Sequence, residues 1–332
     1  MARVAMFSAG SWGTTMAAVF ADAGNGVLVH ARRSEVADAI DTRHENPAYL
    51  PGAVLPDTLR ATTDPAEALS DADLVILSIP AQTLRDNLAV WAPLIEPHAV
   101  VISLMKGVET HSGLRMSQVI TEVTGIPDER VAVISGPNLA REIAAHQPAA
   151  SVIACRDETA AKYIQAACHT SYFRPYTATD VVGCELGGAV KNVIALAVGL
   201  ATGMGLGDNA KALLITRGLA ETARLGTALG ADPLTFSGLA GAGDLMATCS
   251  SPLSRNRTFG EHLGQGLTVA EAALATSQTA EGVKSCRAIL QLARGHGVEM
   301  PITEVVASVI DGHSTVGAAA DMLMARTPKP ER

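Results

Sequence analysis

The first half of the chain repeats one pattern of hydrophobic and polar positions. A short run rich in Val, Ile and Leu is followed by a polar turn and then by an Ala-rich stretch of helical period. These runs are apolar throughout rather than alternating, which is typical of strands covered by helices on both faces. The pattern predicts an α/β domain with a doubly wound parallel sheet, with strands at 4–7, 26–30, 74–79, 99–104, 131–135 and 150–155.

The pattern changes near residue 180, just after a last expected strand at 172–177. Beyond it β-branched runs become rare, and 181–200 and 210–229 carry helical period with closely spaced Gly and Ala. We therefore predict an α/β domain over 1–180, an all-helical domain over 181–326 and a disordered tail at 327–332.

Composition narrows the class of protein. Hydrophobic residues make up 48% and charged residues 17% of the chain, as in soluble α/β enzymes. The net charge of -8 argues against a general affinity for nucleic acid or for an anionic membrane. Any anion site is therefore expected to be a local pocket.

Targeting and metal signals are weak. The five cysteines are odd in number and far apart, which favours reduced thiols in a cytoplasmic protein, and no metal site is expected. The apolar run at 4–7 is too short for a secretory signal. The run at 193–206 is interrupted by glycine and too short for a membrane span, so we expect a buried helix and no membrane insertion.

The stretch VAMFSAGSWGTTMA at 4–17 resembles a dinucleotide-binding fingerprint, G-x-G-x-x-G, placed between a strand and a helix. Its three positions are Ser8, Gly10 and Gly13, so the first glycine is missing. A serine in that turn costs about 1 kcal/mol relative to glycine. A glycine turn without a ligand is the alternative interpretation.

The residues at the end of the second strand favour NADP over NAD. Where an NAD site usually has an acidic residue, this chain has Arg32 and Arg33. Two guanidinium groups suit the extra phosphate of NADP. A solvated basic turn is the alternative.

Other polar residues follow predicted strands or lie on predicted helices. Lys106 follows one strand and could meet an anionic substrate, although an isolated lysine is more often a surface charge. Lys191 lies on an apolar helix after Gly187 and Gly188, which would let a ligand or another backbone approach. Such a lysine either acts in catalysis through a lowered pKa or extends from a half-buried helix to solvent.

A donor cluster at 254–257 has the chemistry of a phosphate site. Ser254, Arg255 and Asn256 together offer hydroxyl, guanidinium and amide groups. Asp244 lies upstream in a glycine-rich turn, where it could orient a lysine or accept a hydrogen bond from a substrate hydroxyl.

Taken together, these motifs resemble the bacterial NAD(P)-dependent glycerol-3-phosphate dehydrogenases. The resemblance covers nearly the whole chain and rests on AGSWGT (9–14), ARR (31–33), LMKG (104–107), ISGPNLARE (134–142), ELGGAVKN (185–192), GLAGAGDL (238–245), SRNRTFG (254–260) and AEGV (280–283). It implies a Rossmann-like NAD(P)-binding domain followed by an all-helical substrate-binding domain. It also implies interconversion of dihydroxyacetone phosphate and sn-glycerol 3-phosphate with NADP(H) or NAD(H), for phospholipid synthesis, by an enzyme that is often a homodimer.

The resemblance also assigns roles to residues. Lys191 would be the acid/base, and Lys106 and Asp244 would be the other catalytic residues. The cofactor would be lined by Ser8, Gly10, Ser11, Trp12, Gly13, Arg32, Arg33, Lys106, Ala140, Arg255 and Glu281. The substrate would meet Lys106, Gly136, Asn138, Lys191, Asp244, Ser254, Arg255 and Asn256.

Two positions depart from the family pattern. Ser8 replaces the usual glycine, which affects cofactor affinity, and Asn138 replaces a serine found in many members, which alters a substrate contact in detail. Two other functions remain open from the sequence. One is a ketoacid reductase similar to ketopantoate reductase, which has no need of the SRNR cluster. The other is a non-catalytic NADP(H)-binding sensor, which has no need of Lys191.

Overall fold

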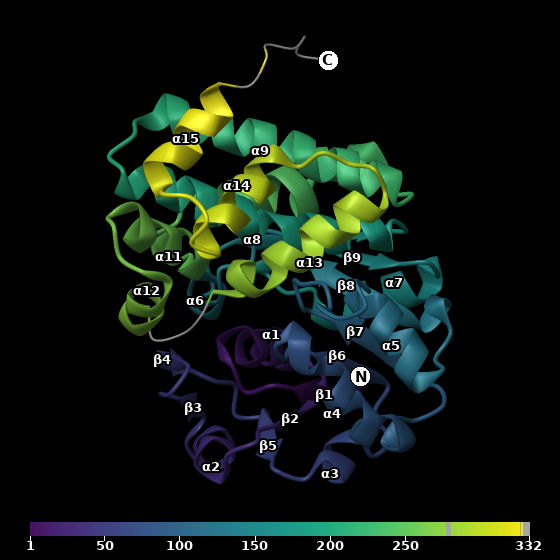
Figure 1. Cartoon of the computed structure of the whole chain (residues 1–332). Helices are drawn as coiled ribbons and strands as arrows, with labels where there is room; N and C mark the ends of the chain where they lie inside the picture. Colours follow the sequence, from purple (N-terminus) through teal and green to yellow (C-terminus); the bar gives the residue numbers. More distant parts are fainter. Residues whose placement is uncertain (277–279, 326, 328–332) are drawn as a thin grey trace. The chain divides into compact units, whose positions relative to one another are not determined.

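The structure is a computed structural model that describes residues 1–276, 280–325 and 327 (Figure 1). The chain forms two compact units. Unit 1 comprises Met1–Glu109 and Leu114–Glu185, and unit 2 comprises Thr110–Gly113 and Leu186–Arg332. Apart from Thr327, the tail expected at 327–332 lies outside the described residues.

Unit 1 has a strand at each apolar run predicted from the sequence, and it adds three short strands. The strands are β1 (Arg3–Phe7), β2 (Gly26–His30), β3 (Glu45–Asn46), β4 (Leu50–Val54), β5 (Arg60–Thr62), β6 (Leu74–Leu77), β7 (Val100–Ser103), β8 (Val131–Ser135), β9 (Ala149–Cys155) and β10 (Phe173–Ala178). The added strands β3, β4 and β5 have two to five residues and no continuous apolar run, which is why the pattern misses them.

The main sheet has the strand order β10-β9-β8-β7-β6-β1-β2-β5, and β3 and β4 form a separate antiparallel hairpin. The pairings in the main sheet are parallel except one, since β9 runs antiparallel to β8 and β10 then runs parallel to β9. The sheet is thus mixed rather than wholly parallel. The connection from β8 to β9 holds only the five-residue helix α6 (Ala140–Ala144), about half as long as a five-residue strand. This helix is too short to return the chain along the sheet.

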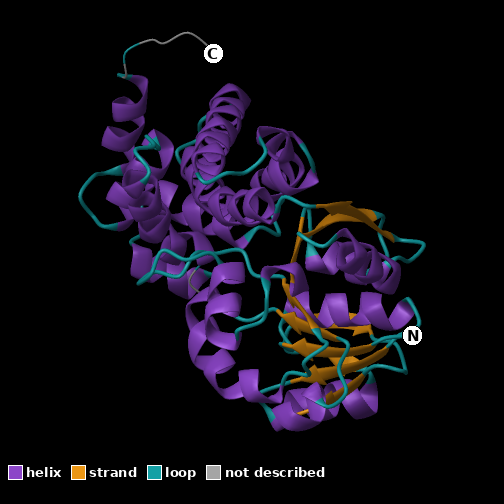
Figure 2. Cartoon of the chain, turned by 90° about the vertical axis from the view of Figure 1, so that its right-hand side faces the viewer, coloured by secondary structure: helices purple, strands orange, loops and turns teal. Residues whose placement is uncertain are grey.

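Helices cover both faces of this sheet (Figure 2). In β1, Val4 and Met6 belong to the core beneath α1, whereas Phe7 belongs to the core beneath α4 and α5. The helices of unit 1 are α1 (Ser11–Asp22), α2 (Ser34–Arg43), α3 (Pro65–Leu69), α4 (Leu84–Trp91), α5 (Met116–Thr124), α6 and α7 (Glu158–Cys168). Two buried cores therefore hold the strand ends in place from opposite sides.

Unit 2 is helical throughout its described secondary structure. Its helices are α8 (Val181–Gly203), whose first residues belong to unit 1, α9 (Asp208–Ala228), α10 (Asp244–Ser250), α11 (Arg255–Gly264), α12 (Val269–Ala275), α13 (Glu281–Gly295), α14 (Pro301–Ile310) and α15 (Val316–Met324). A π-helical turn at Leu239–Gly243 leads into α10. Among the described helices α8 alone is long and apolar enough to span a membrane, but 94% of its most apolar stretch is buried inside the protein.

Helices α8 and α11 pack backbone to backbone through glycines. A Cβ added at Gly199 would lie 2.1 Å from the carbonyl oxygen of Arg257, and one added at Gly260 would lie 2.2 Å from that of Leu196. Gly203 and Gly264 make matching approaches one turn further along. We call these four residues the glycine contact. It sets the distance between the two helices, because no side chain fits between them.

Candidate functional site

The glycine turn, residues 8–13, joins β1 to α1. A Cβ added at Gly13 would lie 2.3 Å from the carbonyl oxygen of Ser8, so the close approach of helix and strand requires glycine at this position. Gly10 is the N-cap residue of α1, and the first amides of the helix leave the turn without intrahelical acceptors. This arrangement has the geometry of a phosphate-binding helix start.

Ser8 occupies a backbone conformation that glycine adopts more readily, with a φ of +151°. Its hydroxyl oxygen accepts a hydrogen bond from the amide of Gly10 at 3.0 Å. The bond offsets part of the backbone strain, and it also occupies one amide of the turn. The turn therefore keeps its shape with serine in the first position.

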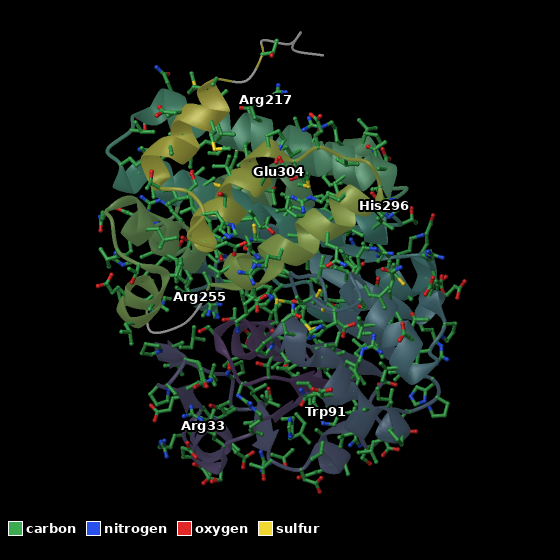
Figure 3. The ribbon with its side chains drawn as sticks, viewed as in Figure 1. Arg33, Trp91, Arg217, Arg255, His296 and Glu304 are labelled. Carbon is green, nitrogen blue, oxygen red and sulfur yellow. The ribbon has the colours of Figure 1, made fainter. Side chains whose placement is uncertain are left out.

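The residues after β2 separate into a core histidine and two exposed cations. His30 packs against Phe7 and Trp91, with ring centroids 5.0 and 5.8 Å away, and burial lowers its pKa. Arg32 is exposed, and Arg33 is half exposed near the start of α2 (Figure 3). Two positive charges thus stand at the end of β2.

The ends of β7 and β8 bring Lys106 and Gly136 together. The Lys106 ammonium donates a hydrogen bond to the Gly136 carbonyl at 3.0 Å. Gly136 has a φ of +145°, and an added Cβ would lie 3.1 Å from the Cα of Ser151. Lys106 is half-buried, so its charge lies at the end of the sheet rather than out in solvent.

Asn138 is oriented by a serine from the next strand. The Ser151 hydroxyl donates to the Asn138 carbonyl oxygen at 2.5 Å, while the Asn138 amide nitrogen is buried without a partner among the described residues. Ser151 lies near the beginning of β9, which meets the end of β8 because the two strands are antiparallel. A search of strand ends in the sequence therefore misses Ser151.

Two further cofactor candidates are Trp12 on α1 and Ala140 on α6. The indole nitrogen of Trp12 is buried and lacks a hydrogen-bond partner within the described part of the chain. Ala140 begins α6, and its carbonyl accepts a hydrogen bond from Thr15 of α1 at 3.2 Å. The start of α6 is thus fixed beside α1.

Unit 2 contains a buried lysine cluster made of Lys191, Asp244 and Thr248. The Lys191 ammonium forms an ion pair with Asp244 and donates to the Thr248 hydroxyl at 2.7 Å. Lys191 is 8% and Asp244 1% exposed, so the charges are held away from solvent. Thr248 also donates to Asp244 at 3.3 Å. Sequence reasoning missed Thr248, although its position four residues after Asp244 on α10 was a usable signal.

The glycines before Lys191 admit backbone rather than leaving an opening at Gly187. A Cβ added there would lie 2.4 Å from the carbonyl oxygen of Ala240, in the π-helical turn that precedes Asp244. The close approach of this turn to α8 brings Asp244 to Lys191. Of the two alternatives that the sequence left open, the structure selects the backbone approach for Gly187.

Asn256 ties three helices together. Its amide nitrogen donates to the Asn192 side chain at 2.9 Å, and its carbonyl oxygen accepts from the Gly282 amide at 2.9 Å. Ser254 caps α11 by accepting from the Arg257 amide at 3.3 Å. For a ligand, Asn256 thus retains mainly its second amide hydrogen.

Arg255 and Glu281 come close enough to interact electrostatically. Burial raises the pKa of the Glu281 carboxyl, and the charges of Arg255 and Lys284 oppose that rise. Arg255 itself is exposed (Figure 3). Unit 2 therefore carries one group of the predicted residues, and unit 1 carries the other.

Comparison with known proteins gives a consistent family. A sequence model described as the NAD-dependent glycerol-3-phosphate dehydrogenase N-terminus matches residues 3–161, and the corresponding C-terminus model matches residues 180–321. The chain is 65% identical over 331 residues to a glycerol-3-phosphate dehydrogenase (NAD(P)+) of Streptomyces griseus, covering 99% of this chain and 98% of that one. It is 61% identical to the protein of the same description from Thermobifida fusca, covering 100% and 99%.

Solved structures agree with the sequence comparisons. The glycerol-3-phosphate dehydrogenase of Coxiella burnetii superposes with a TM-score of 0.92 at 35% identity, covering 97% of this chain and 98% of that one. A ketopantoate reductase from Ralstonia eutropha shares only the fold, with a TM-score of 0.57 at 16% identity over 96% and 99% of the chains. The chain belongs to the NAD(P)-dependent glycerol-3-phosphate dehydrogenase family.

Proposed function

We propose that this protein interconverts dihydroxyacetone phosphate and sn-glycerol 3-phosphate with NADP(H) or NAD(H). The observation that carries the proposal, beside family membership, is the buried cluster of Lys191, Asp244 and Thr248. A cation with a fixed carboxylate partner is suited to stabilise the negative charge that develops on a ketone oxygen when it is reduced.

The residues of unit 1 fit a dinucleotide. Three features support this assignment: the close approach at Gly13, the helix start at Ser11, and the Trp12 indole nitrogen, which is buried without a partner among the described residues. Arg32 and Arg33 would bind the extra phosphate of NADP. Lys106, Ala140, Arg255 and Glu281 complete the proposed cofactor contacts, together with Ser8 and Gly10. When bound, the nicotinamide supplies hydride to the substrate carbonyl carbon, or removes it in the reverse reaction.

Lys191 acts as the acid/base in this proposal. It donates a proton from its ammonium to the ketone oxygen, or accepts one from the C2 hydroxyl in the reverse direction. Asp244 and Thr248 hold the lysine nitrogen in one position, and Asp244 compensates its buried charge. Lys106 would add a second positive charge to the proposed substrate contacts.

The substrate phosphate would bind to donors of α11. Ser254, Arg255 and Asn256 are the proposed contacts, with a guanidinium and an amide hydrogen as the main donors. Gly136 and Asn138 would meet the remaining polar atoms of the substrate. Binding of the phosphate holds the rest of the substrate in one orientation. The binding energy of this remote group thus serves to position the reacting carbon.

The cellular setting of the enzyme is proposed from its cysteines, its net charge, the burial of α8 and the family resemblance. The five buried, unpaired cysteines support a cytoplasmic enzyme. Its glycerol 3-phosphate would supply phospholipid synthesis, and the family resemblance supports a homodimer. The net charge of -8 and the buried position of α8 support a protein without nucleic-acid binding or membrane insertion.

The deciding experiment measures kcat/KM for dihydroxyacetone phosphate, with saturating NADPH and again with NADH. We expect efficient turnover that favours NADPH, and a loss of that preference in the Arg32→Ala, Arg33→Ala double variant. Turnover of ketopantoate in place of the ketose phosphate would establish a ketoacid reductase instead. NADPH binding without turnover of either substrate would establish a sensor.

A further inference from the structure

The β3–β4 hairpin contacts the glycine turn through Asn46. The side-chain amide nitrogen of Asn46 donates to the carbonyl oxygen of Ala9 at 2.8 Å and to the hydroxyl of Thr14 at 2.8 Å. Asn46 is 1% exposed and Thr14 is fully buried. One amide group thus bonds both the turn and the first turns of the helix that follows it.

The Asn46 side-chain amide is oriented so that its donors are hydrogen-bonded and its acceptor is not. Both hydrogens of Asn46 are used, whereas its carbonyl oxygen is buried without a partner in the described structure. A buried unpaired acceptor lowers stability. We therefore attribute the presence of asparagine at position 46 to its two donors, which fix the Ala9 carbonyl and α1 relative to each other, rather than to a gain in the stability of the fold.

Asn25 provides a contrast within the same unit. It is 7% exposed, and its amide nitrogen donates to the carbonyls of Phe20 at 2.8 Å and Ala167 at 2.7 Å. Its carbonyl oxygen accepts from the Ala2 amide at 3.0 Å. The oxygen and both hydrogens of its side-chain amide are used between core elements, so Asn25 is a structural asparagine.

The hairpin makes two further contacts with the predicted cofactor residues. The Ser11 hydroxyl donates to the Tyr49 carbonyl at 2.5 Å. The Arg33 guanidinium lies 5.4 Å from the centre of the Tyr49 ring, within the range of a cation–π interaction. The hairpin therefore touches the residues expected to meet the pyrophosphate and also one expected to meet the 2′-phosphate.

We propose that the β3–β4 hairpin positions the cofactor-binding groups of unit 1, with Asn46 as the positioning residue for the glycine turn and Tyr49 as the positioning residue for Arg33. The inference rests on the proposed cofactor site. Asn46 acts on both cofactors alike, because the pyrophosphate is common to them. Tyr49 acts through its ring on NADP alone, because the 2′-phosphate is absent from NAD.

The test measures dissociation constants for NADPH and NADH by fluorescence titration of the purified enzyme, together with its melting temperature. Asn46→Ala should weaken binding of both cofactors by the same factor, about tenfold, as expected from loss of a buried hydrogen-bonding group. At saturating cofactor its kcat should stay within about twofold of wild type, because the lysine cluster is unchanged. Thr14→Val removes one of the two acceptors with little change in shape, and it should give a smaller loss of the same kind.

The second arm uses Tyr49→Leu, which keeps the backbone carbonyl but removes the ring. It should weaken NADPH binding about two- to fivefold, the range of an exposed cation–π contact, and leave NADH binding unchanged. Equal weakening of both cofactors would overturn the assignment of Tyr49.

Asn25→Ala is the matched control, since it should lower the melting temperature without changing either dissociation constant. If Asn46→Ala or, where that variant fails to fold, Thr14→Val behaves like this control, the inference is wrong while the proposed function stands. Wild-type protein that binds neither cofactor would overturn both.

Discussion

The glycine turn of unit 1 and the lysine cluster of unit 2 are built in opposite ways. The turn consists of six consecutive residues, and backbone amides and close packing at Gly13 define its geometry. The cluster consists of three side chains from α8 and α10, and it forms only because the π-helical turn approaches Gly187. In the proposed function, the first region binds the cofactor and the second transfers a proton. Binding geometry can thus be local in sequence, whereas chemistry here depends on tertiary packing.

The strongest test of this division is Lys191→Ala. Loss of the acid/base should lower kcat by about 10²–10⁴-fold, while the dissociation constant for NADPH should change little because the glycine turn is untouched. The steady-state rate of NADPH consumption gives kcat, and fluorescence titration gives the dissociation constant for NADPH. Lys211→Ala is the control, since Lys211 is paired with Asp208 outside the cluster. Full activity in the Lys191 variant would contradict the proposed role.

The close backbone packing of α8 against α11 at the glycine contact is tested by Gly260→Ala. The added methyl would lie 2.2 Å from the Leu196 carbonyl, so the helices must separate and the free energy of unfolding should fall by about 1–3 kcal/mol. Urea denaturation gives this value. Gly295→Ala, where an added Cβ meets nothing within 4 Å, should instead gain about 0.5–1 kcal/mol. Equal effects of the two substitutions would remove the packing argument.

Glu221 is a second buried carboxyl in unit 2 and can be compared with Asp244. Asp244 pairs with a lysine, whereas Glu221 accepts hydrogen bonds from backbone amides. Glu221 accepts from Ile302 at 2.7 Å and Thr303 at 3.4 Å, at the start of α14. Burial raises its pKa from 4.5 to about 7, against the effect of these amides and of Arg224. Between pH 4.5 and about pH 7, the Glu221 carboxyl holds its proton in the folded protein but loses it in the unfolded chain. The free energy of unfolding should therefore fall as pH rises through this window, by up to about 3 kcal/mol.

This pH dependence is measured by urea denaturation at pH 5 and pH 8 for wild type and Glu221→Gln. The stability of wild type relative to the variant should be lower at pH 8 than at pH 5, because the variant cannot ionise. Glu304→Gln, at an exposed position on α14, should leave the difference between the two pH values as in wild type. A difference unaffected by Glu221→Gln would show that this carboxyl does not titrate in the window.

The smallest expected effect concerns Ser8→Gly. Glycine relieves the φ of +151° but removes the hydrogen bond to Gly10, and each contribution is about 1 kcal/mol. The released Gly10 amide can then face the cofactor, so NADPH should bind about two- to fivefold more tightly with kcat unchanged. An unchanged dissociation constant would mean that serine already fits the turn.

Sequence reasoning reached the local features and missed those that depend on packing. The strand at 4–7, the turn at Gly10 and Gly13, and the long helices α8 and α9 are visible because periodicity and fingerprint are local. The reversal of β9 was not visible, since its apolar run carries no direction. Ser151 was missed for the same reason, because it lies near the start of a strand rather than the end.

The hairpin residues Asn46 and Tyr49 were also missed, because β3 and β4 lack an apolar pattern and lie far from the turn in sequence. The lysine cluster could be anticipated only in part. Asp244 was expected either to orient a lysine or to accept a hydrogen bond from a substrate hydroxyl, but the link of Thr248 to both residues depends on the spacing between α8 and α10. The roles of these residues remain predictions that the variants above examine.

The glycine contact between α8 and α11 also determines how this protein can vary. At each of its four positions a carbonyl oxygen lies 2.1–2.3 Å from where a Cβ would stand, and the carbonyls belong to the opposite helix. No single second substitution can restore the fit, because the obstacle is backbone rather than a side chain. In a library of random variants selected for growth, these remote positions should therefore tolerate as few replacements as Lys191 itself.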